Sequence, residues 1–177
     1  MTPIKTEGSL SERLRGAIGA WHAAVTDDRA TRATLRRAQN LDEVPLAALA
    51  DLATRVLGRV GDDPTGLRRT EQLARVALVV GEIDHDTEHG LGRALRRVRR
   101  PLSEERLRLL LDTPEIDLFV RLLRGALVQV ERRGPLAATA TLILDWHYPT
   151  ARARARRKLA LDYFQADLDD AAAGDTL

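Results

Sequence analysis

Apolar residues recur along this chain with the spacing of helices rather than strands. Within residues 91–98, Leu91, Leu95 and Val98 stand at i, i+4 and i+7, which places them on one side of a helix. Alternation of apolar and polar residues, which marks a half-buried strand, is not sustained in any segment, and β-branched residues are scattered. The pattern therefore predicts an all-α fold.

Capping residues and prolines divide this pattern into about nine predicted helices. Ser9 and Glu12 have the spacing of a capping box, and Asp28 can cap a second helix. Thr113 and the two residues after it offer a cap, a first-turn proline and a first-turn acid for the seventh helix. The predicted helices cover about residues 9–25, 29–39, 45–61, 67–80, 91–100, 103–112, 113–133, 135–146 and 149–168.

A polar, acidic segment interrupts the series of helices at residues 82–90. It lies between Gly81 and Gly90, so we interpret it as a mobile loop and as the boundary between subdomains. Short connections elsewhere favour a compact antiparallel bundle on each side. The predicted organisation is an N-terminal helical subdomain (1–81), the mobile acidic loop (82–90), a C-terminal helical subdomain (91–168) and an acidic tail (169–177).

Nearly all of the positive charge is arginine, although the formal net charge is only +2. The planar guanidinium matches the geometry of phosphate oxygens, so an arginine-rich surface suits nucleic acid. A GC-rich genome would also raise the arginine content, without any functional meaning. The positions of the arginines therefore carry the argument, rather than their number.

The predicted helix at 91–100 gives the strongest charge signal. Arg93, Arg96, Arg97 and Arg100 lie at i, i+3, i+4 and i+7, opposite the apolar stripe, and no acid occurs between Leu91 and Leu102. An ordinary solvated face usually mixes the two signs, because like charges repel at this spacing. The segment indicates a phosphate partner, with a plain basic surface as the alternative.

Three further predicted helices carry arginines at related spacing. The basic run of the ninth has no acid between residues 148 and 161, but acids of the tail (Asp167, Asp169, Asp170 and Asp175) could neutralise it in cis. The arginines in question are Arg29, Arg32, Arg36 and Arg37 in the second helix, Arg121 and Arg124 in the seventh, and Arg152, Arg154, Arg156 and Arg157, followed by Lys158, in the ninth.

Aromatic residues are few, and most have the spacing of core residues. We assign Trp21, Phe119, Tyr163 and Phe164 to packing. Single-strand readout normally requires exposed aromatic rings for base stacking. The sequence therefore predicts sequence-independent binding to phosphates, with an affinity that falls steeply with salt.

Several classes of chemistry are not supported by the sequence. There is no cysteine, and the motifs of nucleotide-binding loops, zinc proteases and serine hydrolases are missing. His85 and His89 have metal-ligand spacing, but they fall in the predicted loop and lack a convincing further ligand set. We expect no catalytic residues, no metal and no cofactor. No apolar run approaches a membrane span and the N-terminus has no apolar signal segment, so a cytoplasmic, membrane-free protein is expected.

A series of short segments between Trp21 and Phe164 resembles the CasB family, the small subunits of the type I-E CRISPR surveillance complex called Cascade. Each segment is weak alone, and their order and spacing carry the resemblance. Two departures are Leu159, where a further aromatic is expected, and Trp21-His22, where more aromatic surface is expected. The segments are Trp21, Arg32–Ala38, Leu91–Arg97, Glu105-Arg106 with Leu109-Leu110, Leu118-Phe119 with Leu122–Arg124, Leu144–Trp146 and Leu161–Phe164.

The resemblance implies an all-α, non-catalytic protein in two helical subdomains. It implies two copies that bridge the large subunit (CasA) and the backbone subunits (CasC). These copies would contact the guide RNA and target DNA and hold the displaced DNA strand of the R-loop. The nucleic-acid contacts that the resemblance implies are Arg36, Arg37, Arg106, Arg124, Arg152 and Arg154. The charge pattern adds Arg93, Arg96, Arg97, Arg121, Arg156 and Arg157.

Two interpretations from other classes remain. A dimeric helical transcription repressor would read duplex DNA with a recognition helix within residues 31–40. A helical adaptor would bind only protein, and its arginines would reflect genome composition. Specific duplex binding favours the repressor, and a lack of nucleic-acid binding favours the adaptor.

Overall fold

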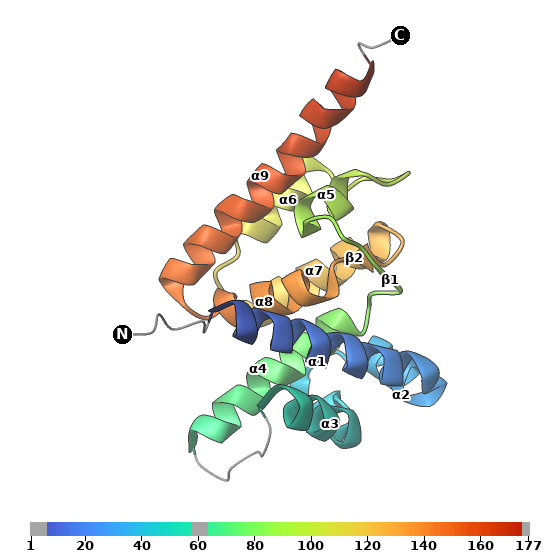
Figure 1. Ribbon diagram of the computed structural model, residues 1–177, viewed down its shortest axis with the longest axis vertical. Helices are drawn as coiled ribbons and strands as arrows, with labels where there is room; N and C mark the ends of the chain where they lie inside the picture. The colour runs from blue at the N-terminus through green and yellow to red at the C-terminus, as the bar shows by residue number, and fades with distance from the viewer. Residues whose placement is uncertain (1–6, 58–63, 175–177) are drawn as a thin grey trace. The chain divides into compact units, whose positions relative to one another are not determined.

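The computed structural model describes the backbone of residues 7–57 and 64–174 and the side chains of residues 13–57 and 69–166. These residues form nine α-helices, one short 3-10 helix and one two-stranded sheet, so the predicted all-α class is confirmed (Figure 1). Within them, no helix combines the length and the apolar character that a membrane span requires. The chain divides into two compact units, Met1–Gly81 and Glu82–Leu177, which are described separately.

The first unit is built from helices alone. Helix α1 packs against α2 and α3, and α4 packs against α2, α3 and η1. In sequence order the elements are α1 (Glu7–Asp27), α2 (Arg29–Arg37), η1 (Leu41–Glu43), α3 (Leu46–Leu57) and α4 (Pro64–Val80).

Trp21 holds the core of the first unit together. Its side chain is fully buried, and its indole Nε1 donates a hydrogen bond of 2.8 Å to the carbonyl oxygen of Ala48 on α3. A buried indole N–H needs such a partner, because an unpaired one costs about 1–3 kcal/mol. Leu35 from α2 and Val76 from α4 complete the same core with no exposed surface. The tryptophan therefore joins α1 to α3 through both packing and a hydrogen bond.

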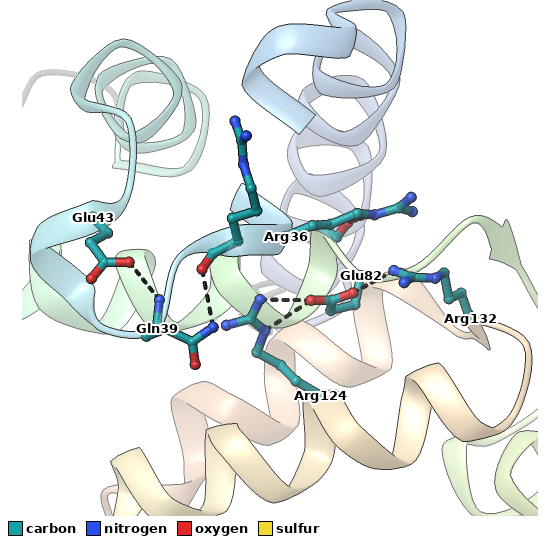
Figure 2. Close-up of polar contacts among 8 residues, drawn as sticks. Arg36, Gln39, Glu43, Glu82, Arg124 and Arg132 are labelled. Atoms are coloured by element: carbon teal, nitrogen blue, oxygen red, sulfur yellow. Dashed lines mark hydrogen bonds and ion pairs between the residues drawn. The ribbon is translucent and has the colours of Figure 1, made fainter. Parts of the chain in front are cut away.

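Side-chain caps fix both ends of α2. Asp28 accepts hydrogen bonds from the backbone N–H of Ala30 (3.0 Å) and Thr31 (3.2 Å) and from the Thr31 hydroxyl (2.6 Å). These bonds, led by the one from the Thr31 hydroxyl, lower the pKa of Asp28 below its ordinary value. At the other end, the sequence pattern predicts that the helix continues to Gln39, but α2 ends at Arg37. The Gln39 N–H donates to the Glu43 carboxylate (2.7 Å), outside the helix (Figure 2).

The second unit packs α9 against α5, α6 and α8, and α7 against α6 and α8. Two short parallel strands pair His85 with Arg133 and Asp86 with Gly134. In sequence order the elements are β1 (His85–Asp86), α5 (Leu91–Arg96), α6 (Glu104–Asp112), α7 (Ile116–Gln129), β2 (Arg133–Gly134), α8 (Leu136–Trp146) and α9 (Pro149–Gly174).

Stacked aromatic rings form the core of the second unit. Phe119 on α7 and Trp146 on α8 stack with ring centroids 3.6 Å apart and an interplanar angle of 13°. The Trp146 indole donates to the carbonyl oxygen of Thr113 (3.1 Å), and the buried Tyr163 hydroxyl donates to that of Leu102. These bonds tie α8 and α9 to the two segments on either side of α6.

Helix α5 crosses α9 at a glycine. A Cβ atom on Gly92 would lie only 2.4 Å from the backbone N of Tyr163 and 2.5 Å from the carbonyl oxygen of Leu159. Any larger residue would push the two helices apart. The close crossing places the arginines of α5 next to α9.

Several predicted helix bounds are wrong, each for a local reason. Helix α5 ends at Arg96 instead of near residue 100, because Leu102 turns back and its N–H donates to the Leu95 carbonyl oxygen (2.9 Å). Helix α7 ends at Gln129, because Glu131 and Arg132 adopt positive φ angles of 58° and 57°. Glu115, rather than Thr113, is the N-cap of α7.

Helices α1 and α9 are longer than predicted. Helix α1 begins at Glu7, ahead of Ser9, and the side chains of Ser9 and Glu12 lie outside the described residues. Helix α9 continues through the predicted acidic tail as far as Gly174.

The segment at residues 82–90, which we interpreted as a mobile loop, carries β1 and contacts the rest of its unit. The N–H groups of Asp84 and His85 donate to the carbonyl oxygen of Arg132, at 2.8 and 3.3 Å. The Asp86 carboxylate accepts a hydrogen bond of 2.9 Å from the Leu136 N–H and so caps α8. The N-cap residue of α8, Pro135, makes no side-chain cap of its own. The segment therefore supplies a cap that the helix sequence lacks.

Candidate nucleic-acid interface

The turn after α5 gathers arginines into one surface. Arg96, Arg97, Val98 and Arg99 line a shallow, open depression. Helix α5 ends at Arg96. The next arginines, Arg97 and Arg100, therefore belong to an irregular turn and not to a helical stripe. The predicted face is therefore present as a cluster with a different geometry from the one expected. We call residues 93–100 the α5 arginine cluster.

Two members of the α5 arginine cluster are oriented by α9. The Arg96 guanidinium lies 5.3 Å from the centroid of the Tyr163 ring, and its Nη1 donates to the Tyr163 hydroxyl at 3.2 Å. Arg97 donates to the carbonyl oxygen of Ala166 at 3.5 Å. Such contacts reduce the side-chain freedom that a guanidinium must lose when it meets a phosphate. Arg93, on the same helix, is half-buried.

The basic run of α9 separates into two faces. Arg154, Arg157 and Lys158 are exposed and lie at i, i+3 and i+4 on one side of the helix. Arg152 and Arg156 turn toward the neighbouring elements. Arg152 donates to the carbonyl oxygen of Pro114 (3.1 Å), and Arg156 pairs with the Asp112 carboxylate (2.7 Å).

The continuous helix of α9 keeps the acidic end of the chain away from the basic run. Arg157 and Asp169 are twelve positions apart in one helix, which corresponds to about 18 Å along its axis. That separation exceeds the Debye length of about 8 Å at physiological ionic strength. Positions 169 and 170 therefore lie beyond this screening length from Arg157 along the helix axis, and position 167 lies about 15 Å from it. The side chains of these acids and of Asp175 lie outside the described residues.

Charges of opposite sign are separated along α9. Cations occur over residues 152–158 and acids over residues 167–170. Apart from Arg152, these charges lie outside the first and last turns, where the helix dipole acts, so the dipole does not account for their order.

Arg124 occupies a structural ion pair and not an exposed face. The Glu82 carboxylate is buried between two arginines, with Arg124 Nη2 at 2.6 Å from Oε1 and Arg132 Nη1 at 2.6 Å from Oε2 (Figure 2). The Arg124 side chain is only 11% exposed. Its guanidinium neutralises a buried carboxylate, so its position argues against a contact with phosphate. Arg124 thus has a structural role inside the second unit.

Sequence reasoning missed the partners in this ion pair. Glu82 opens the acidic segment at residues 82–90 and resembles the exposed acids that follow it. It is separated from Arg124 by 42 positions and from Arg132 by 50. The one local signal was that Glu82 lies two residues after the apolar end of α4 and directly before Ile83, a pattern that favours burial.

The remaining predicted arginines are dispersed. Arg106 on α6 is exposed and donates to the side-chain oxygen of Gln129, and Arg121 on α7 is exposed. In the first unit, Arg36 is half-buried with its Nε 3.4 Å from the carbonyl oxygen of Gly81, while Arg37 is exposed. Within the second unit, the α5 arginine cluster and the exposed cations of α9 are the positions that the fold brings onto two contacting helices.

The aromatic assignments are correct for three residues and wrong for one. Trp21, Phe119 and Tyr163 are completely buried, as packing requires. Phe164 is 43% exposed and touches Tyr163 edge to face, with ring centroids 5.3 Å apart. Tyr148, just before α9, is also exposed.

The histidine pair at 85 and 89 does not form part of a larger donor group. Both side chains are exposed, and the described residues contain no group of three or more His, Cys, Asp or Glu side chains placed to hold a metal ion. The carboxylate of Asp86, which lies between them in the sequence, accepts the hydrogen bond from the Leu136 N–H that caps α8.

Comparison with known proteins adds evidence on ancestry and fold. The sequence matches the family model described as CRISPR-associated protein Cse2 over residues 31–164. The structure is similar to the crystal structure of CasB from Thermobifida fusca, with a TM-score of 0.58 and 15% sequence identity, over 88% of this chain and 96% of that chain. At that identity the structural likeness concerns the fold alone. No curated protein sequence matches the chain.

Proposed function

The chain belongs to the CRISPR-associated protein Cse2 family, and from that membership we propose that it is a small, non-catalytic subunit of a type I-E CRISPR surveillance complex of the Cascade kind. The resemblance to CasB that was inferred from short sequence segments is confirmed. The observation that carries the functional proposal is the position of the cations. The α5 arginine cluster and the exposed cations of α9 lie on two helices that pack together, and no acid occurs within residues 91–102 or within residues 148–161.

Such a surface suits phosphates better than bases. Guanidinium groups bind phosphate oxygens through paired hydrogen bonds, and these contacts carry no sequence information. Exchange of a DNA duplex for a guide–target heteroduplex is nearly balanced in free energy, so modest backbone contacts can tip it. The protein would stabilise the R-loop, including the displaced strand. The proposed contacts are Arg36, Arg37, Arg93, Arg96, Arg97, Arg106, Arg121, Arg152, Arg154, Arg156 and Arg157, joined by Lys158.

The partners follow from the same proposal. The protein would contact the guide RNA and the target and displaced DNA strands. It would also contact the large subunit CasA, the backbone subunits CasC and a second copy of itself. Location in the cytoplasm fits this set of partners.

The structure offers little to the repressor interpretation. A recognition helix within residues 31–40 would present the side chains of one continuous helix to the major groove. Here α2 stops at Arg37. The Gln39 amide donates to the carbonyl oxygen of Arg37 at 3.1 Å, and the Asn40 amide donates to Glu43 at 2.7 Å. The Gln39 side chain therefore caps the end of α2, and the Asn40 side chain takes part in the start of η1.

Charge reversal on α9 tests the proposal. We expect Arg154→Glu with Arg157→Glu to shorten the lifetime of the R-loop in the reconstituted complex by about tenfold or more, since two favourable phosphate contacts become repulsive. The measurement is R-loop dissociation followed by single-molecule fluorescence. Co-purification of guide RNA with the complex checks that assembly is intact.

The matched control reverses two arginines elsewhere. Arg55 and Arg108 are exposed, each paired with an acid one helical turn away on its own helix. Arg55→Glu with Arg108→Glu changes the net charge equally and should leave the R-loop lifetime close to the wild-type value. Equal lifetimes for the α9 variant and the wild type would refute the proposed contacts.

A further inference from the structure

An exposed apolar strip continues the basic face of α9. Arg157, Leu161 and Phe164 lie at i, i+4 and i+7, so they follow one line along the helix. Leu161 is 61% exposed and Phe164 is 43% exposed. Apolar side chains of this size on a surface helix usually mark a contact site when they gather. Contacts with phosphates alone would not require exposed apolar side chains.

The ring of Phe164 is held in place although it is exposed. Its neighbour Tyr163 is completely buried and meets it edge to face at 83°. Tyr163 is itself fixed by the hydrogen bond to Leu102 and by the guanidinium of Arg96 over its ring. A ring that is already oriented loses little conformational freedom when a ligand covers it.

Asp162, the acid next to Leu161 in the sequence, points away from this strip. Asp162 directs its carboxylate toward Gly90, where its Oδ2 would lie 2.2 Å from a Cβ atom built on that glycine. It therefore belongs to the side of α9 that faces the start of α5. On the exposed side, Arg157 and Lys158 are the charged neighbours that precede Leu161.

We propose that Phe164, with Leu161 beside it, is a platform on which a base of single-stranded nucleic acid stacks while Arg157 and Lys158 hold the adjoining phosphates. The inference rests on the proposed function and deepens it, because it names the form of nucleic acid that this face accepts. A partner with flat apolar rings linked by negative charges matches a surface on which exposed apolar side chains directly follow cations along one side of a helix. In an intact duplex the ring faces are stacked on one another and are hidden from such a platform.

Binding of base-containing and abasic strands tests the platform. Fluorescence anisotropy would compare the full chain on a labelled oligodeoxyadenylate and on an abasic strand of equal length, at low salt (about 50 mM), where phosphate contacts are strongest. We expect the wild type to bind the base-containing strand about 5-fold to 100-fold more tightly than the abasic strand. Phe164→Ala should remove that preference and leave the affinity for the abasic strand unchanged.

Two substitutions at the same position separate stacking from apolar contact. Phe164→Tyr keeps an aromatic face and should keep the preference, whereas Phe164→Leu keeps an apolar side chain and should lose it. Leu118→Ala is the matched control, because Leu118 on α7 is 41% exposed and lies outside the α9 strip. It should leave both affinities unchanged.

The outcomes distinguish this inference from the proposed function. Equal wild-type affinities for the two strands would overturn the stacking platform and leave phosphate binding intact. A Phe164→Ala variant that changes self-association in sedimentation but neither affinity would show a protein contact, and would also overturn it. An Arg157→Glu, Lys158→Glu variant that binds both strands as the wild type does would contradict the phosphate contacts themselves. A wild type that binds neither strand would refute both proposals.

Discussion

At the scale of single residues, arginines that look alike in the sequence have opposite roles. Arg124 and Arg157 both occur in helices and both lie next to another cation or one turn from it. Arg124 is buried against Glu82, whereas Arg157 is exposed. The difference arises from an acid 42 positions away from Arg124, and no local pattern reports it. Only the structure therefore distinguishes the exposed arginines from those that pair with an acid inside the fold.

The buried ion pair should contribute strongly to stability. Removal of one partner of a buried pair leaves an uncompensated charge, which typically costs about 3–5 kcal/mol. Because Arg132 still reaches Glu82, we expect Arg124→Ala to lower the free energy of unfolding by about 3 kcal/mol in urea titrations. Glu82→Met combined with Arg124→Met should cost much less, since the buried carboxylate is removed and the remaining Arg132, 29% exposed, can turn its charge to solvent. A cost below about 1 kcal/mol for Arg124→Ala would contradict this account.

Asp145 should make the stability depend on pH. Burial raises the pKa of this carboxyl above its ordinary value, and the charge of Arg154 partly offsets the effect. A raised folded-state pKa means that the folded protein holds the proton more tightly than the unfolded chain. The stabilising contribution is complete below the unfolded pKa and is lost as the pH rises through the folded pKa.

We therefore expect Asp145→Asn to be more stable than the wild type at neutral pH. The advantage should shrink as the pH falls through the range in which the wild-type carboxyl becomes protonated. Thermal unfolding from pH 3 to pH 7 measures the difference. If the stability advantage of Asp145→Asn over the wild type grew as the pH fell, the result would contradict a raised pKa of Asp145.

At the scale of elements, capping chemistry predicted where helices begin better than where they end. Asp28 caps α2 and Ser103 caps α6, as the sequence indicated. The end of α5 was missed because Leu102 is buried and must return to the core just after Pro101. The extent of α9 was underestimated because acids suggested a tail, although three alanines at 171–173 favour a helix. Apolar periodicity thus predicted the core, while long-range packing determined the ends.

The crossing of α5 and α9 depends on one glycine. Gly92→Ala places a methyl group against the backbone of α9, so we expect a loss of about 1–3 kcal/mol in the free energy of unfolding. The α5 arginine cluster should also shift relative to α9, and the affinity for single-stranded DNA should fall. Urea titration and anisotropy measure the two effects.

Gly125→Ala provides the matched control on α7. A Cβ atom there meets nothing within 4 Å. This substitution should raise the stability slightly, by about 0.4–1 kcal/mol, because alanine favours the helix over the unfolded chain. If both variants behave alike, the close crossing is not what constrains residue 92.

At the scale of the whole molecule, the sequence predicted the helical class and the family but not the distribution of charge in space. The order of short segments from Trp21 to Phe164 was enough for the family, because such segments record ancestry. The cationic surface depends on which arginines find internal partners and on how α9 continues beyond residue 168. Those features follow from tertiary contacts, and they decide which residues are available to a partner.

The separated charges of α9 have a consequence for the encounter with a polyanion. A long helix that is positive near one end and negative near the other is a large permanent dipole, and Lys158 and Asp167 are nine positions apart, which corresponds to about 14 Å along the axis. The field of an approaching nucleic acid exerts a torque on such a dipole, so the molecule turns its basic end forward before any atoms touch. Productive orientations are thereby enriched among collisions, and added salt slows association by weakening this alignment.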